Sequence, residues 1–213
     1  MTKTIIFDFD GTLADTFELI VSITNRLSPK FGYQPVAEED IAKLQNLSSR
    51  DIIRQSGISY LKIPFLIRRL RNQLKNRIAE VNLFPGIKEL ILDLKSEGYS
   101  VGIITSNSLD NVKKLMALNG LENSFDFIYS VGRLFGKHKA IASLLKREKL
   151  NPETVFYVGD ETRDLDAAKK AGVKAIAVSW GFNSPEALAR NNPDFLASNP
   201  QELREFIKGA RHL

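Results

Sequence analysis

The stretch IIFDFDGTLADT at residues 5–16 determines how the rest of this chain is interpreted. Its apolar residues predict a buried strand over residues 4–9, which carries Asp8 and Asp10 at its carboxyl end. Because side chains alternate along a strand, the two carboxylates are expected on the same face, and like charges held that close need a cation. Ligands of open α/β sheets bind at the carboxyl ends of the strands, so this pair marks the expected mouth of a site.

The chain alternates strand and helix patterns from residue 83 onward, with short connections. This alternation predicts an α/β fold, a Rossmann-like parallel sheet core with helices on both faces. The near-continuous apolar runs are typical of strands buried on both sides. The further predicted strands cover residues 100–106, 127–131, 154–160 and 174–180, and the core helices cover residues 86–97, 109–119, 138–149, 163–171, 184–191 and 200–208.

Residues 17–81 interrupt this alternation with helical patterns and no convincing strand. The segment therefore predicts an inserted α-helical cap domain, and residues 1–16 together with 82–213 form the predicted α/β core. Its linkers are expected near residues 14–17 and 80–86. The predicted cap helices cover residues 17–30, 38–45, 49–56 and 60–79.

The composition excludes several classes of protein. The net charge is +5, but the basic residues are spread along helices, which favours a solvated surface over a nucleic-acid partner. No apolar run is long enough to span a bilayer, and the N-terminus has no signal-peptide pattern, so we predict a cytoplasmic protein with no membrane partner. A monomer or a homodimer is expected. The absence of cysteine leaves oxygen or histidine as metal ligands.

Polar residues follow other predicted strands as well. Thr-Ser-Asn at 105–107 offers a hydroxyl and backbone amides before a helix, an arrangement that can hold a phosphate. In the sequence GDETRD, Asp160 and Asp164 supply oxygen ligands suited to magnesium (Mg2+). Between these clusters, Lys137 and Lys139 offer a cation to a transferring phosphoryl group. Each cluster alone is more often structural, but their shared position at or near strand ends predicts one common site.

These four clusters, in this order, resemble the four motifs of the haloacid dehalogenase superfamily of phosphohydrolases. The helical insert after the first motif, and the closing segment that starts GFNSPEAL at residue 181, are similar to the phosphoglycolate phosphatase-like branch. The dehalogenase branch lacks the second aspartate of the first motif, so Asp10 favours phosphoryl transfer over carbon–halogen cleavage.

The resemblance implies a role for each acidic residue. Asp8 is implied as the nucleophile that forms an aspartyl phosphate, and Asp10 as the general acid and base. Magnesium is implied to bind the carboxylate of Asp8, the backbone carbonyl of Asp10 and the carboxylate of Asp160. Asp164 is implied to assist directly or through water.

The resemblance also implies a phosphate-binding group. Thr105 and the backbone amide of Ser106 are expected to hold phosphoryl oxygens, and Lys137 to neutralise the charge there. Either Lys137 or Lys139 could serve as this lysine, and Lys137 is preferred because it follows a glycine. Asn107 stands where several relatives carry lysine, which concerns the outer shell of the site.

The substrate is less determined by the sequence than the chemistry. In the cap, Arg50 could pair with an anionic substrate group, although an exposed role beside a helix cap at Ser48 is equally compatible. The basic cluster from Arg68 to Arg77 is expected on an exposed helix face. The leading hypothesis is a magnesium-dependent phosphatase for a small phosphorylated metabolite, phosphoglycolate first. Its alternatives are a sugar phosphomutase and a catalytically silent binding protein on the same fold.

Overall fold

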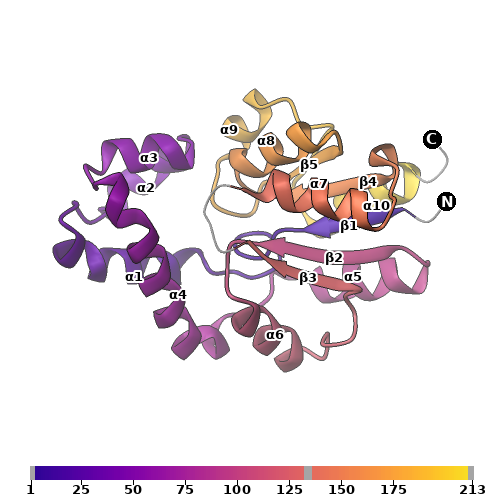
Figure 1. Cartoon of the computed structure of the whole chain (residues 1–213), viewed down its shortest axis with the longest axis horizontal. Helices are drawn as coiled ribbons and strands as arrows, with labels where there is room; N and C mark the ends of the chain where they lie inside the picture. The colour runs from indigo at the N-terminus through magenta and orange to yellow at the C-terminus, as the bar shows by residue number, and fades with distance from the viewer. Residues whose placement is uncertain (1–2, 132–135, 211–213) are drawn as a thin grey trace.

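A computed structural model describes residues 3–131 and 136–210 of the chain, with a six-stranded sheet at the centre (Figure 1). All neighbouring strands run parallel, in the order β3-β2-β1-β4-β5-β6. The predicted parallel α/β fold is therefore confirmed. The strands are β1 (Thr4–Phe7), β2 (Ser100–Thr105), β3 (Phe127–Ser130), β4 (Val155–Gly159), β5 (Lys174–Val178) and β6 (Phe195–Ala197).

The first strand lies in the middle of this sheet and pairs with β2 on one side and β4 on the other. At its carboxyl end, Phe7 lies opposite Ile103 of β2 and Val158 of β4. Parallel strands end at the same edge of a sheet. The segments that follow β1, β2 and β4 are thereby brought together, and these are three of the segments that carry the predicted site residues.

Helices cover both faces of the sheet, and the alternation along β1 explains the two layers. Ile5 and Phe7 point into one hydrophobic cluster, and Ile6 points into the other. The first cluster packs against α5 (Ile87–Ser96), α6 (Leu109–Leu118) and α10 (Pro200–Gly209). The second packs against α7 (Lys137–Arg147), α8 (Thr162–Ala171) and α9 (Pro185–Arg190), with a short 3-10 turn η4 (Pro152–Thr154) before β4.

Two strand predictions differ from the structure. The short strand β6 was not predicted, because three residues between turn-forming segments give too little periodicity to detect. The first strand ends at Phe7, so Asp8 and Asp10 lie in the loop after it. The alternation of side chains along a strand therefore does not determine where these two carboxylates point. One backbone bond from Asp8 N to the carbonyl of Val158, at 2.8 Å, still fixes Asp8 beside β4.

The segment predicted as a cap forms helices at one end of the sheet (Figure 1). They share a hydrophobic cluster of their own that includes Ile23, Leu27, Phe31, Ile58 and Leu74. The division of the chain at these boundaries stays a prediction, and "cap" denotes residues 17–81 below. Its elements are α1 (Phe17–Phe31), η1 (Glu38–Asp40), α2 (Ile41–Gln45), α3 (Ser49–Gln55), η2 (Tyr60–Lys62), α4 (Ile63–Arg77) and η3 (Ile78–Glu80).

The two chain segments that join the cap to the core lie side by side. Asp15 N donates to the carbonyl of Asn82 at 2.9 Å, and Phe84 N donates to the carbonyl of Leu13 at 3.1 Å. Between these bonds Ala14 forms an antiparallel bridge with Leu83. The insert therefore leaves and rejoins the core at one place.

In the part of the chain that the structure describes, no helix is both long enough and apolar enough to cross a membrane.

Candidate active site

Three buried carboxylates meet at the carboxyl edge of the sheet. Asp8 follows β1, Asp160 follows β4, and Asp164 lies in the first turn of α8. One oxygen from each lies within 4.8 Å of the others, a spacing at which they could hold a metal ion together. The sequence predicted all three as metal ligands, and the parallel sheet brings them together because β1 and β4 are neighbours.

Lys137 is the first residue of α7 and reaches into this acidic group. Its Nζ lies 2.5 Å from Asp8 Oδ2 and 2.6 Å from Asp164 Oδ1, and only 2% of the residue is exposed. Burial alone lowers the pKa of this ammonium, but the charges of Asp164 and Asp8 outweigh burial and raise it. Lys139, the other candidate, is exposed. Of the two lysines, the structure brings Lys137 to the carboxylates.

Asp160 is held in place by hydrogen bonds from two loops. Thr12 Oγ1 donates to Oδ1 at 2.7 Å, and Phe182 N donates to Oδ2 at 2.8 Å. Gly11 has a positive φ of 75° and lies so close that a Cβ there would collide with the Asp160 carboxylate. The glycine after Asp10 is thus required both by its left-handed backbone and by this close approach.

The electrostatics of the acidic group favour a bound cation. Burial raises the pKa of Asp160 well above its ordinary value, and the charges of Glu161, Asp164 and Asp8 raise it further. Burial also raises the pKa of Asp164 to about 7, although Lys137 opposes that shift. Hard oxygen donors in this arrangement fit a divalent cation, which would favour their ionised forms.

Asp10 has a different hydrogen-bond partner from the three carboxylates, namely the side-chain amide of Asn107. Asn107 Nδ2 donates to Asp10 Oδ1 at 2.9 Å and to Oδ2 at 3.1 Å. The oxygen of the same amide accepts from Asn111 Nδ2 at 2.8 Å, which fixes its orientation. Burial raises the pKa of Asp10, and the Asn107 hydrogen bond offsets only part of this increase. A carboxyl group with a raised pKa is suited to donate a proton near neutral pH.

The Thr-Ser-Asn segment follows β2 as predicted and adjoins Asp10. Thr105 is fully buried, and its Oγ1 accepts from Asn107 N at 3.0 Å. Ser106 lines the same small cavity as Asp10. The sequence interpretation assigned Asn107 to the outer shell, so its direct contact with Asp10 was missed.

A cavity of about 190 Å3 lies between these core residues and the cap. The cap contributes apolar residues of α4 together with Arg71, which was expected on an exposed helix face. Burial lowers the pKa of the Arg71 guanidinium, and the charge of Asp10 opposes that shift. The lining residues are Asp10, Ile20, Ile67, Leu70, Arg71, Leu74, Ser106, Asn107, Glu161, Arg163 and Phe182.

A sequence signal for Arg71 existed in the helical spacing. Ile67, Leu70, Arg71 and Leu74 recur at intervals of three, one and three residues, so the arginine falls within the apolar face of α4. The position of a charged residue on an apolar face indicates a functional contact. The number of basic residues nearby is a weaker signal.

Arg50, the predicted cap residue, lies elsewhere. It lines a separate cavity of about 220 Å3 together with Lys137, His138 and Arg163. Arg50 is not among the described residues that line the cavity of Asp10. The structure therefore brings Arg50 near the lysine of the site and Arg71 near its second aspartate.

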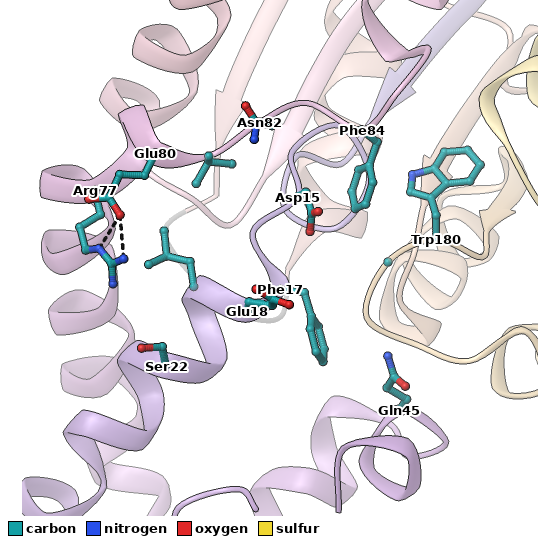
Figure 2. A pocket seen from close by; sticks show the side chains of 13 residues that line it. Asp15, Phe17, Glu18, Ser22, Gln45, Arg77, Glu80, Asn82, Phe84 and Trp180 are labelled. Atoms are coloured by element: carbon teal, nitrogen blue, oxygen red, sulfur yellow. Dashed lines mark hydrogen bonds and ion pairs between the residues drawn. The ribbon is translucent and has the colours of Figure 1, made fainter. Parts of the chain in front are cut away.

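A cavity of about 590 Å3, named the hinge cavity below, lies beside the two linkers between cap and core, and Asp15, Asn82 and Phe84 are among the residues that line it (Figure 2). Figure 2 shows Trp180 and Phe84 of the core on one side of it and Phe17 and Gln45 of the cap on another. Among the described residues, its lining includes none of those predicted to act in catalysis. The position of the carboxylates, and not the size of a cavity, therefore marks the candidate active site.

Comparison with known proteins agrees with this geometry. Residues 5–178 match the family described as "Haloacid dehalogenase-like hydrolase". A phosphoglycolate phosphatase from Synechococcus elongatus is 39% identical over 205 residues, which cover 96% of this chain and 97% of the relative. Pyrophosphatase PpaX from Bacillus thuringiensis is 29% identical over 209 residues, covering 96% of each protein. A crystal structure of a predicted phosphatase from Clostridium acetobutylicum, 23% identical, superposes with a TM-score of 0.83 and covers 98% of this chain and 100% of its own.

The chain thus belongs to the haloacid dehalogenase-like hydrolases, the family indicated by its motifs, its sheet and its acidic group. Within that family it is a phosphoric monoester hydrolase of the phosphoglycolate phosphatase-like branch.

Proposed function

We propose that this chain hydrolyses phosphoglycolate, a small phosphomonoester, through a phosphorylated Asp8. The observation that supports this proposal most directly is the contact of Lys137 Nζ with Asp8 Oδ2 at 2.5 Å, inside the group formed with Asp160 and Asp164. A buried cation beside a nucleophilic carboxylate can stabilise the charge of a phosphoryl group transferred to that carboxylate.

In the first step, an oxygen of Asp8 attacks phosphorus, and the bond between phosphorus and the leaving oxygen breaks. Asp10 gives its proton to that oxygen, which therefore leaves as the uncharged hydroxyl group of glycolate. The raised pKa of Asp10 supports this role, because the proton must be present when the substrate binds. The products of this step are glycolate and an acyl phosphate on Asp8.

In the second step, Asp10 takes a proton from a water molecule as the water oxygen attacks phosphorus. The bond between phosphorus and Asp8 breaks, which releases inorganic phosphate and restores both carboxyl groups. Thr105 and the backbone amide of Ser106 hold the phosphoryl oxygens, and Lys137 offsets their charge throughout.

Asp8, Asp160 and Asp164 would hold magnesium together with the backbone carbonyl of Asp10. When bound, magnesium supplies the positive charge that lets an anionic phosphoryl group approach several carboxylates. The raised pKa values of Asp160 and Asp164 support this assignment, because burial and neighbouring negative charges disfavour their ionised forms, and a bound cation would favour them.

The choice of phosphoglycolate rests on Arg71 and on the relative from Synechococcus elongatus. Arg71 lines the small cavity that also contains Asp10, on the side of the cap. A guanidinium there can bind the carboxylate of a small leaving group in a two-pronged hydrogen bond. A cavity of about 190 Å3 favours a compact leaving group over an extended one.

Substitution Arg71→Ala is expected to raise the KM for phosphoglycolate about 10- to 100-fold, because a charged hydrogen bond to the leaving group is lost. Hydrolysis of p-nitrophenyl phosphate, which has no carboxylate, should change less than about threefold. Phosphate release by wild type and variant, on a panel with phosphoglycolate, pyrophosphate and a sugar phosphate, measures this effect. Arg69→Ala is the matched control, since Arg69 is exposed on the same helix.

The same panel distinguishes the alternatives. Wild-type preference for pyrophosphate, or equal KM values for the two arginine variants, would contradict the proposed substrate. An isomeric sugar phosphate formed without release of inorganic phosphate would identify a phosphomutase instead.

Magnesium is expected to raise the midpoint of thermal unfolding, by more at about pH 8 than at about pH 6. Without metal, the raised pKa values of Asp160 and Asp164 stabilise the folded state fully below the ordinary value of 3.8. That stabilisation is lost as the pH rises through their folded-state values, about 7 for Asp164. Magnesium must displace the same protons, so its binding strengthens over this interval. Thermal unfolding of chelator-treated protein, with and without magnesium at both pH values, measures the difference, and equal shifts would argue against these ligands.

A further inference from the structure

Asn183 lies in the loop after β5 and connects the cap to the core through its side chain. Its Nδ2 donates to the backbone carbonyl of Gln45 at 2.8 Å and to that of Leu47 at 2.9 Å. Both acceptors belong to the cap, where Gln45 is the last residue of α2 and Leu47 lies between α2 and α3. Asn183 is only 5% exposed, so these bonds are formed away from solvent.

The other polar groups of Asn183 bind the acidic end of the core. Its Oδ1 accepts from Thr162 N, the first residue of α8, at 2.9 Å. Its backbone N donates to the carbonyl of Asp160 at 3.3 Å, and the preceding residue, Phe182, donates from its N to Asp160 Oδ2 at 2.8 Å. A single short loop therefore holds both a predicted metal ligand and the cap.

Neighbouring contacts support the same junction. Ser184 N donates to the Gln45 carbonyl at 2.9 Å, and Ser49 Oγ of the cap donates to Glu161 Oε2 at 2.6 Å. The side chain of Gln45 borders the hinge cavity in Figure 2. Side chains do not pack closely across a cavity of about 590 Å3. The position of the cap relative to the core therefore depends more on the polar contacts at the edge of this cavity.

We propose that Asn183 is a positioning residue that holds the cap closed over the core and couples this closure to Asp160. Its two amide bonds to the cap exist only while cap and core are in contact, and the carbonyls become hydrated when they separate. These bonds therefore favour the closed arrangement selectively. The inference rests on the proposed function, because closure brings Arg71 to the cavity that holds Asp10.

Asn183→Asp provides the sharpest test, because it retains the shape and the Oδ1 acceptor for Thr162 N but removes both donors to the cap. Asn183→Ala removes the donors without adding a charge near Asp160. In both variants the KM for phosphoglycolate should rise about 10- to 100-fold, while kcat falls less than about threefold, because saturating substrate restores the closed population. A merely structural role would lower kcat through loss of folded enzyme and leave KM unchanged.

Hydrogen exchange provides a readout that does not depend on the reaction. In both variants, backbone amides of residues 41–55 should exchange at least about tenfold faster, while those of β4 and of α8 beyond Thr162 keep their wild-type rates. Asn119→Asp is the matched control, since Asn119 Nδ2 donates to the Leu115 carbonyl at the end of a core helix, at 2.8 Å. Unchanged exchange in residues 41–55, or equal acceleration throughout the core, would overturn the proposal. Wild-type protein that does not hydrolyse phosphoglycolate refutes the proposed function, and the exchange measurement still decides the role of Asn183.

Discussion

Replacement of Asp8 by asparagine is expected to lower kcat by at least about 10^4-fold, the size of effect found when a covalent nucleophile is removed. A carboxamide cannot form the acyl phosphate, but it keeps the shape of the carboxyl group and one acceptor for Phe9 N, which now donates to Asp8 Oδ1 at 2.7 Å. The fold should therefore persist. Phosphate release measures the activity, and circular dichroism with thermal unfolding measures the fold.

Asp15→Asn is the matched control for this substitution, because Asp15 lies in the same segment after β1 and is exposed. Its kcat should stay within about twofold of wild type, as expected for a surface residue outside the site. If Asp8→Asn retained substantial activity on phosphoglycolate with a native circular dichroism spectrum, Asp8 would not be the nucleophile.

Lys137→Ala is expected to affect both stability and activity. Removing one partner of a buried ion pair leaves the carboxylates of Asp8 and Asp164 uncompensated, which should lower the free energy of unfolding by about 3–5 kcal/mol. The loss of positive charge at the phosphoryl group should lower kcat by about 10^2- to 10^3-fold. Denaturant unfolding measures the first effect, and phosphate release measures the second.

Magnesium separates this charge effect from a loss of packing. If charge is the cause, magnesium should stabilise Lys137→Ala more than wild type, because the cation replaces part of the missing positive charge. Lys139→Ala should leave stability and activity close to wild type, since Lys139 is exposed. A large effect at Lys139 and a small one at Lys137 would reverse their assignment.

The sequence was sufficient for most of the fold because the signals were local and repeated. Apolar runs such as residues 100–105 and 155–159 identify buried strands, and the alternation with helices predicts a parallel sheet. Strand β6 escaped detection because three residues cannot display a period. Strand β1 was predicted too long, because Phe9 is buried in the loop beyond the strand and continues its apolar pattern.

The candidate site was predictable where strand order alone brings residues together, as for Asp8 and Asp160, which follow the neighbouring strands β1 and β4. Contacts that depend on the placement of the cap were not predictable in the same way. Arg71 reaches the cavity of Asp10 only because α4 packs at the end of the sheet, and Asn183 binds carbonyls 136 and 138 residues away in the chain. The contacts of Asn183 leave no periodic trace in the sequence, whereas Arg71 leaves only the helical spacing of the apolar face on which it lies.

The paired linkers at Leu13 to Asp15 and Asn82 to Phe84 have a consequence for how this architecture can change over time. Because the insert begins and ends at adjacent points, its length and content are nearly independent of the strand order beneath it. A replacement of residues 17–81 would leave Asp8, Asp160, Asp164 and Lys137 in the core. Under the proposed function, different leaving groups can thus be accommodated by changes in the cap, while the residues proposed to break the bond between phosphorus and oxygen stay the same.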